Sequence, residues 1–109
     1  MTYIPTYVVD APERAEIDVL PGSLLLEFGV DWCPHCQGAQ PAIAEVLGNY
    51  PELRHVKIED GPGRPLGRSF RVKFWPTLIV LREGREVARV VRPTRVGELQ
   101  EKLSAALGG

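Results

Sequence analysis

Two cysteines spaced three residues apart are the most reactive feature of this sequence. They lie in the segment Trp32-Cys33-Pro34-His35-Cys36 of the 109-residue chain. Two cysteines are too few for a framework of structural disulfides. The pair by itself is consistent with a redox dithiol, with half of a zinc site, or with two inert buried thiols.

The position of the pair favours the redox dithiol. A predicted strand, Leu24 to Val30, ends just before it, and a predicted helix begins at Pro34. Cys33 then takes the N-cap and proline the first helical position. Free backbone N–H groups and the positive end of the helix point toward the Cys33 sulfur, and both favour the thiolate. We expect Cys33 to be the nucleophile with a depressed pKa, and Cys36 to be the more buried resolving thiol.

The two other interpretations of the pair are weaker. A tetrahedral zinc site needs four ligands, and only His35 and His55 remain as soft candidates. Inert thiols belong in a core, whereas a helix N-terminus beside Trp32 is not a core position. We therefore expect no metal and no cofactor.

Apolar periodicity and turn residues predict the helices and strands around the cysteines. Predicted strands cover Tyr3 to Val9, Leu24 to Val30, Leu53 to Ile58, Pro76 to Leu81 and Glu86 to Val91. Predicted helices cover Ala11 to Leu20, Pro34 to Tyr50, Arg64 to Arg71, and a last segment with Val96, Leu99, Leu103 and Leu107 on its apolar face. Asp10 and Thr94 are the predicted N-caps of the first and last helices, and Pro41 should kink the second. This order predicts an α/β fold with one central sheet, in a single domain over residues 1–109.

Several positions along nearly the whole chain form a pattern with the cysteines. Pro41 stands five residues after the second cysteine, Trp75-Pro76-Thr77 precedes an apolar strand, and Gly84 lies in the last hairpin turn. Together with the Trp-Cys-x-x-Cys segment, this set resembles the thioredoxin family. The resemblance implies a thioredoxin fold, with a central mixed sheet of four or five strands flanked by four helices. It also implies catalysis of dithiol–disulfide exchange.

An acidic residue interrupts the apolar strand before the cysteines. A lone carboxylate at Glu27 is costly if it is buried. The thioredoxin family has a buried aspartate at the matching position, so the resemblance implies that Glu27 is the general base that deprotonates Cys36. The alternative is a partly exposed acid paired with a cation such as Lys57.

The resemblance also implies a substrate-binding rim around Cys33. Pro76 would follow a cis peptide bond, which brings the backbone of Trp75 beside the disulfide, where an extended substrate peptide could pair with it. Trp32 and Trp75 would widen this rim, although core packing is an alternative for Trp75. Arg92 stands where thioredoxin has a glycine, close to a bound partner, and makes this edge bulky and cationic.

The residues between the cysteines depart from the family. Thioredoxin usually has Gly-Pro there, whereas Pro34-His35 resembles the strongly oxidising Dsb-type disulfide donors. An imidazole that donates to the Cys33 thiolate, or stabilises its charge, would stabilise the reduced state and raise the reduction potential. We therefore predict a potential between those of the two groups. The alternative is a solvated histidine with no effect.

Charge is distributed unevenly, although 13 basic and 14 acidic residues give a formal net charge of −1. Between Gly61 and Arg95 the acids are Glu83 and Glu86, and the bases are Arg64, Arg68, Arg71, Lys73, Arg82, Arg85, Arg89, Arg92 and Arg95. This is either a solvated face or a docking surface for acidic protein partners. The overall balance gives no signal for a nucleic-acid or membrane partner.

No stretch approaches the roughly 20 apolar residues of a membrane span. The start of the chain, Met1 to Pro5, lacks the pattern of a signal peptide. We expect a cytoplasmic monomer, or a periplasmic one only if a leader has been removed.

Two functions remain open from the sequence. The first is a thiol–disulfide oxidoreductase with protein disulfide or dithiol substrates and a redox partner, either a reductase or an oxidant. The second is an interaction or assembly-chaperone module on the same fold, whose cysteines are not essential.

Overall fold

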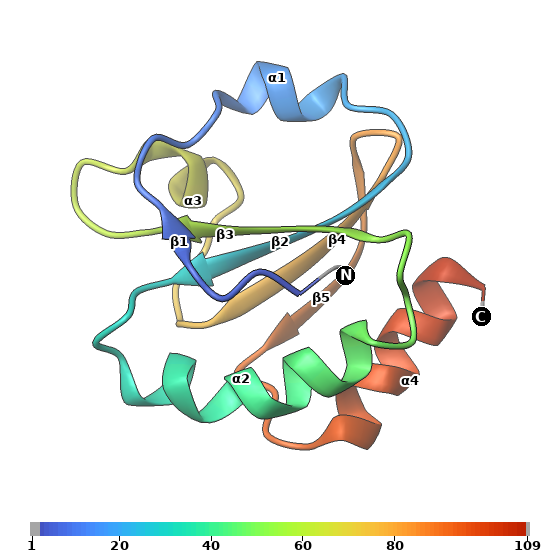
Figure 1. Cartoon of the computed structure of the whole chain (residues 1–109). Coiled ribbons are helices and arrows are strands. Elements are labelled where there is room, and N and C mark those ends of the chain that lie inside the picture. Colours follow the sequence, from blue (N-terminus) through green and yellow to red (C-terminus); the bar gives the residue numbers. More distant parts are fainter. Residues whose placement is uncertain (1–2, 109) are drawn as a thin grey trace.

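A mixed five-stranded sheet forms the centre of the computed structural model, which describes residues 3–108 (Figure 1). Its strands are β1 (Tyr7–Val8), β2 (Ser23–Gly29), β3 (Arg54–Glu59), β4 (Thr77–Arg82) and β5 (Arg85–Val91), in the spatial order β1-β3-β2-β4-β5. The pairs β1–β3 and β2–β3 are parallel, and β2–β4 and β4–β5 are antiparallel. The predicted fold class is confirmed.

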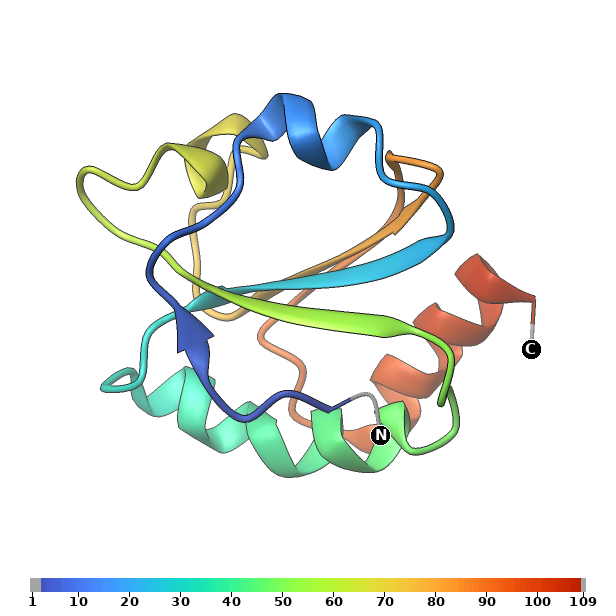
Figure 2. The same cartoon turned by 45° about the horizontal axis from the view of Figure 1, so that its top comes forward.

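Helices cover both faces of this sheet. The short helices α1 (Arg14–Asp18) and α3 (Pro65–Ser69) lie on one face, and the longer helices α2 (Pro34–Leu47) and α4 (Val96–Leu107) lie on the other (Figures 1 and 2). The amino end of α2 follows the carboxyl end of β2 after a short loop of residues 30–33. The sheet therefore places the cysteine pair at one edge of the molecule, beside the loop that leads into β4.

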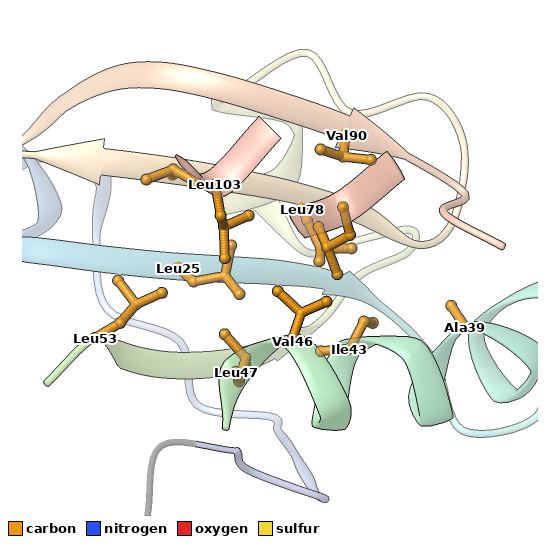
Figure 3. Close-up of a cluster of buried hydrophobic side chains, with 11 residues drawn as sticks. Leu25, Ala39, Ile43, Val46, Leu47, Leu53, Leu78, Val90 and Leu103 are labelled. Atoms are coloured by element: carbon orange, nitrogen blue, oxygen red, sulfur yellow. The ribbon is translucent and has the colours of Figure 1, made fainter. Parts of the chain in front are cut away.

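Alternation along β2 divides the apolar residues between two clusters, because successive side chains point to opposite faces. Leu24, Leu26 and Phe28 pack with residues of α1 and α3. Leu25 packs with α2 and α4 in the cluster of Leu25, Ala39, Ile43, Val46, Leu47, Leu53, Leu78, Val80, Val90, Leu99 and Leu103 (Figure 3). Glu27 shares the face of Leu25 and so points toward α2.

The first predicted strand is too long, since β1 contains only Tyr7 and Val8. The backbone before β1 is hydrogen-bonded to side chains of β3 and does not continue the strand pairing. The N–H of Ile4 donates to His55 Nδ1 at 2.9 Å, and the carbonyl of Pro5 accepts from Lys57 Nζ at 3.1 Å. The expectations that concern Met1 and Thr2 lie outside the described residues.

Both predicted side-chain caps are wrong. Helix α1 begins at Arg14 after Glu13 as N-cap, so Asp10 does not cap it. Ala11 cannot start the helix because it precedes a proline, which disfavours helical backbone. Helix α4 begins after Arg95, whose extended backbone (φ −127°, ψ 139°) puts Thr94 one residue too early to cap it.

Two helices end earlier in the structure than the sequence predicts. Helix α2 is continuous across Pro41 and ends at Leu47, where the prediction extended to Tyr50. Tyr50 precedes a proline, which disfavours helix there too. Helix α3 ends at Ser69 because Arg71 takes a left-handed φ of 58°. The predicted turn at Glu83-Gly84 is confirmed, and both residues have the positive φ of a tight hairpin turn.

Candidate active site

The two cysteines occupy the first turn of α2 as predicted. Cys33 is the N-cap, with extended backbone (φ −82°, ψ 121°), and Pro34 follows at the start of the helix. Both thiols are free and buried, and Cys36 is the more buried of the two, with 1% exposure against 6% for Cys33. The predicted order of burial is confirmed.

Opposing influences act on the Cys33 sulfur. Burial is the largest, and it raises the pKa of the thiol. Hydrogen bonds from the backbone N–H and the thiol of Cys36, and from the backbone N–H of His35, act in the other direction. The positive charge of Arg92 adds to them. The net result is a Cys33 pKa below that of an ordinary thiol, because the helix terminus supplies donors that bind the thiolate.

The Cys36 sulfur behaves in the opposite way. Burial raises the pKa of the Cys36 thiol to about 11, and the neighbouring Cys33 adds to the rise. Hydrogen bonds that the Val30 backbone and the Tyr7 hydroxyl can donate to the Cys36 thiolate offset only part of this rise. The Cys33 thiol therefore loses its proton at a lower pH than an ordinary thiol, whereas the Cys36 thiol keeps its proton near neutral pH.

Trp32, Trp75 and Pro76 form the rim around these sulfurs. The Trp75–Pro76 peptide bond is cis, as the resemblance implied. The Trp75 ring packs on Val30 and the cysteines, and its Nε1 donates to Asp60 Oδ2 at 2.9 Å. The indole of Trp32 is 72% exposed and meets that of Trp75 edge to face, with 5.8 Å between ring centroids. Trp75 thus both packs and lines the rim.

Arg92 lies against the backbone that was predicted to pair with substrate. Its Nε donates to the Trp75 carbonyl at 2.9 Å, and its guanidinium lies 5.1 Å from the centroid of the Phe74 ring. Phe74 is 55% exposed. Arg92 has a left-handed φ of 52°, a conformation that favours glycine. The structure therefore brings the predicted Arg92, Trp75 and Pro76 together beside Cys33.

His35 reaches Cys33 in a way that the sequence did not indicate. The contact is a hydrogen bond from the backbone N–H of His35, and the residue itself is exposed. A backbone donor is supplied by any residue other than proline at this position.

Glu27 is fully buried, so the alternative of a partly exposed acid is wrong. Its Oε1 pairs with His55 Nε2 at 2.9 Å, and its Oε2 accepts from Gln40 Nε2 at 2.8 Å and from the Tyr7 hydroxyl at 3.3 Å. His55 Nδ1 accepts the N–H of Ile4. Nε2 must therefore carry the hydrogen and donate it to the Glu27 carboxylate.

Lys57 reaches Glu27 only through an intermediate. Its ammonium donates to Gln40 Oε1 at 3.0 Å, and the amide of Gln40 in turn donates to Glu27 and to the Cys36 carbonyl. Tyr3 also donates its hydroxyl to Gln40 Oε1, at 2.7 Å. Gln40 thus links the buried charges to the backbone of the active-site helix.

Sequence reasoning missed Tyr7, Gln40 and His55 as members of this site. Tyr7 pairs in register with Lys57, and Lys57 with Glu27, so three neighbouring strands present these side chains on one face. His55 lies two residues before Lys57 and therefore shares its face. Polar residues at alternate positions of a buried strand were the available signal, but His55 was weighed only as a zinc ligand.

Two adjacent thiols whose pKa values are shifted in opposite directions suit dithiol–disulfide exchange, because the thiol with the lower pKa can attack first while the other stays protonated. On this fold they define a protein disulfide oxidoreductase. The Thioredoxin family model matches residues 9–105. The chain therefore belongs to the thioredoxin family.

Known proteins similar to this chain include bacterial and plant thioredoxins. The structure of thioredoxin 2 from Pseudomonas aeruginosa PAO1 in its reduced form has a TM-score of 0.88 and 57% identity, covering 96% of this chain and 98% of that one. Thioredoxin H8 of Arabidopsis thaliana is 31% identical over 81 residues, which are 74% of this chain and 54% of that protein. Thioredoxin H-type of Fagopyrum esculentum is 26% identical over 81 residues, with 74% and 69% covered.

No helix within residues 3–108 combines the length and the apolar character that a membrane crossing needs.

Proposed function

We propose that this chain exchanges disulfides with protein substrates, with Cys33 as the nucleophile and Cys36 as the resolving thiol. The observation that carries the proposal is the opposite direction of the two pKa shifts, with Cys33 lowered and Cys36 raised to about 11. The Cys33 thiolate attacks one sulfur of a substrate disulfide, and the other sulfur leaves as a thiolate that takes a proton from water. The product is a mixed disulfide between Cys33 and the substrate.

Glu27 is the proposed base of the second step. The Cys36 proton passes to the Glu27 carboxylate, and the resulting thiolate attacks Cys33 Sγ. The Cys33–substrate bond breaks, the Cys33–Cys36 disulfide forms, and the second substrate sulfur leaves as a thiolate that takes a proton from water. Two electrons have then moved from the chain to the substrate. In the reverse direction the oxidised chain donates its disulfide.

The proposed substrate site is the backbone of Trp75 beside Pro76, bordered by Arg92. An extended peptide would pair with this backbone as an added strand. The Trp75 carbonyl already accepts from Arg92 Nε, and its second lone pair is available to a substrate N–H. The exposed basic residues Arg71, Lys73 and Arg92 near this point favour acidic protein partners.

We also propose a reduction potential above that of thioredoxin. The support is the set of backbone donors and the Arg92 charge, which stabilise the reduced Cys33 thiolate. A titration of the Cys33–Cys36 couple against glutathione measures the potential. The Pro34-His35 dipeptide adds to this proposal, so His35→Pro should lower the potential, and an unchanged or higher value would contradict the role given to His35.

The proposed cellular setting is the cytoplasm, where glutathione and thioredoxin systems keep free thiols reduced. The proposed partners are protein disulfides or dithiols, together with a redox partner that is a reductase or an oxidant. The proposed working form is a monomer.

Insulin reduction tests the activity. The wild-type chain should turn over, and Cys33→Ser should not, because serine lacks a stable anion near neutral pH. Equal turnover by both proteins would end the proposal. Cys36→Ala should accumulate the mixed disulfide, which captures substrates covalently.

The interaction or assembly-chaperone module stays as a second candidate, and the Arg92–Trp75 contact is the observation that favours it. A partner could bind this rim without disulfide exchange and leave the hydrogen bond between Arg92 Nε and the Trp75 carbonyl intact. Such a partner would be retained equally by the wild type and by Cys33→Ala/Cys36→Ala. Covalent capture by Cys36→Ala alone would favour the oxidoreductase.

A further inference from the structure

The hydroxyl of Tyr7 lies between the resolving thiol and the buried acid. It donates to Glu27 Oε2 at 3.3 Å, and it lies close enough to the Cys36 sulfur to influence the pKa of that thiol through hydrogen bonding. Gly29 makes this approach possible, because a Cβ at that position would lie 2.6 Å from Cys36 Sγ and 2.7 Å from the Tyr7 hydroxyl. The hydroxyl and the sulfur therefore meet over the bare backbone of Gly29.

The Tyr7 ring that carries this hydroxyl also contacts Lys57. Tyr7 pairs in register with Lys57 at the parallel β1–β3 junction, and the Lys57 ammonium lies 4.3 Å from the centroid of the Tyr7 ring. Burial, and then the charges of Glu27 and Cys36, raise the pKa of Tyr7 far above its ordinary value. Tyr7 thus stays a neutral hydroxyl that can accept one proton while it gives up another.

We propose that the Tyr7 hydroxyl relays the proton from Cys36 to Glu27 when the mixed disulfide resolves. This inference rests on the proposed roles of Cys36 and Glu27. The S–H of Cys36 gives its proton to the Tyr7 oxygen as the Tyr7 O–H gives its own to Glu27 Oε2. Tyr7 ends neutral, Glu27 ends protonated, and the Cys36 thiolate forms next to the Cys33–substrate bond that it breaks.

The change at Cys33 on binding substrate favours transfer of the Cys36 proton toward Tyr7. In the reduced protein the Cys36 thiol donates to the Cys33 thiolate. Once Cys33 is bound to substrate its sulfur has lost its charge and is a poor acceptor. The Cys36 proton then has the Tyr7 oxygen as its buried alternative. The relay therefore becomes favourable only after the first step has occurred.

Tyr7→Phe is the variant that tests the relay, because it keeps the ring and removes the hydroxyl. Tyr3→Phe is the matched control, since the Tyr3 hydroxyl belongs to the same buried network but donates to Gln40. In single-turnover reactions with a disulfide-bonded peptide, Tyr7→Phe should slow resolution by on the order of tenfold to a hundredfold. Mixed disulfide should accumulate. Alkylation of Cys33 by iodoacetamide should stay close to the wild-type rate.

The pH dependence of the resolution rate distinguishes a proton relay by Tyr7 from a purely structural role of its hydroxyl. Hydroxide replaces the relay as the pH rises toward the Cys36 pKa of about 11. The gap between Tyr7→Phe and wild type should therefore narrow with increasing pH, whereas misplacement of the sulfur would leave a constant gap. A constant gap, or an equal slowing in Tyr3→Phe, would overturn the relay.

Glu27→Gln distinguishes failure of the relay from failure of the proposed base. If Glu27→Gln slows resolution and Tyr7→Phe does not, the relay is wrong and Glu27 acts without Tyr7. If neither variant slows resolution, the proposed role of Glu27 fails and the relay fails with it. Slowing by both, with little further loss in the double variant, is the result expected of one shared proton path.

Discussion

The pKa values of the two cysteine thiols are shifted in opposite directions although the residues lie within one turn of the same helix. Cys33 stands at the N-cap, where backbone N–H groups without helical partners turn toward it. Cys36 already lies inside the helix and faces the sheet, so burial dominates its pKa. Between Cys33 and Cys36 the balance of desolvation and hydrogen bonding therefore reverses. Hydrogen bonds favour the thiolate of Cys33, and desolvation favours the thiol of Cys36.

Replacing Arg92 by alanine should raise the pKa of Cys33, because it removes a positive charge that favours the thiolate. Iodoacetamide alkylation measured against pH reports the shift. The difference from wild type should shrink in high salt, since Arg92 is exposed and its field is screened. Arg95→Ala, a nearby exposed arginine, is the control. An unchanged alkylation midpoint in Arg92→Ala would show that the hydrogen bonds from Cys36 and His35 lower the Cys33 pKa without the Arg92 charge.

Gly29→Ala should destabilise the reduced protein by about 1–3 kcal/mol, because the added Cβ would overlap Cys36 Sγ and the Tyr7 hydroxyl. Urea unfolding of the reduced protein measures the loss. Gly38→Ala is the matched control, since a Cβ at Gly38 meets nothing within 4 Å and alanine suits a helix interior. The control should gain up to about 1 kcal/mol. Equal stability of Gly29→Ala and wild type would refute the close approach.

At the scale of elements, the sequence predicted what depends on local pattern. The nearly continuous apolar run of β2 and the helical spacing of Ile43 and Leu47 in α2 identified their elements, because a strand covered on both faces is apolar throughout and a helix buries one face. The helix caps failed because Asp10 and Thr94 suit a cap chemically, whereas the backbone of neighbouring residues decides where a helix starts. Local side-chain preference is weaker than the dihedral restriction that Pro12 places on Ala11.

The site was predictable only in part for a related reason. Cys33 and Cys36 are adjacent in the chain, and helix geometry alone relates them. Glu27 meets Tyr7 only because β1 pairs with β3 and β3 with β2. Strand order is a property of the whole sheet that periodicity does not report. Glu27 was found because it interrupts an apolar strand, and its role was inferred from a family resemblance, while its neighbours Tyr7 and His55 were not found.

Helix α4 should depend on its apolar face for attachment to the sheet. Leu103 is fully buried among Leu25 and other residues of the cluster in Figure 3. Leu103→Ala should cost about 2–5 kcal/mol of unfolding free energy, from lost burial and from the cavity that remains. Val87→Ala, at a 45% exposed position on β5, should change stability much less. Urea unfolding measures both, and similar losses would contradict the assigned core.

At the scale of the whole molecule, the buried polar network connects distant parts of the chain to the reacting sulfurs. The segment before β1 reaches Glu27 through His55, and α2 reaches Glu27 through Gln40. Every described buried side-chain polar atom has a hydrogen-bond partner. Such a network holds a charge at the centre of the fold without leaving an unpaired group. The hydrogen bonds of Glu27 consequently connect the paired strands and helix α2 to the protonation of the active-site thiols.

This linkage predicts opposite pH dependences of stability for the two thiols of the reduced protein. The folded-state pKa of Cys33 is lowered, so its contribution is fully present above the ordinary value of 9.0 and is lost as the pH falls through the folded pKa. The folded-state pKa of Cys36 is raised from 9.0 to about 11, so its contribution is present below 9.0 and is lost as the pH rises toward 11.

Urea unfolding of the reduced wild type, Cys33→Ala and Cys36→Ala at several pH values separates these contributions. The stability advantage of wild type over Cys33→Ala should grow as the pH rises to about 9, because the unfolded thiol holds its proton longer than the folded one. The advantage over Cys36→Ala should fall between about 9 and 11, because there the unfolded thiol loses its proton first. Slopes of the same sign for both variants would mean that the two sulfurs share one environment, and the division into nucleophile and resolving thiol would lose its physical basis.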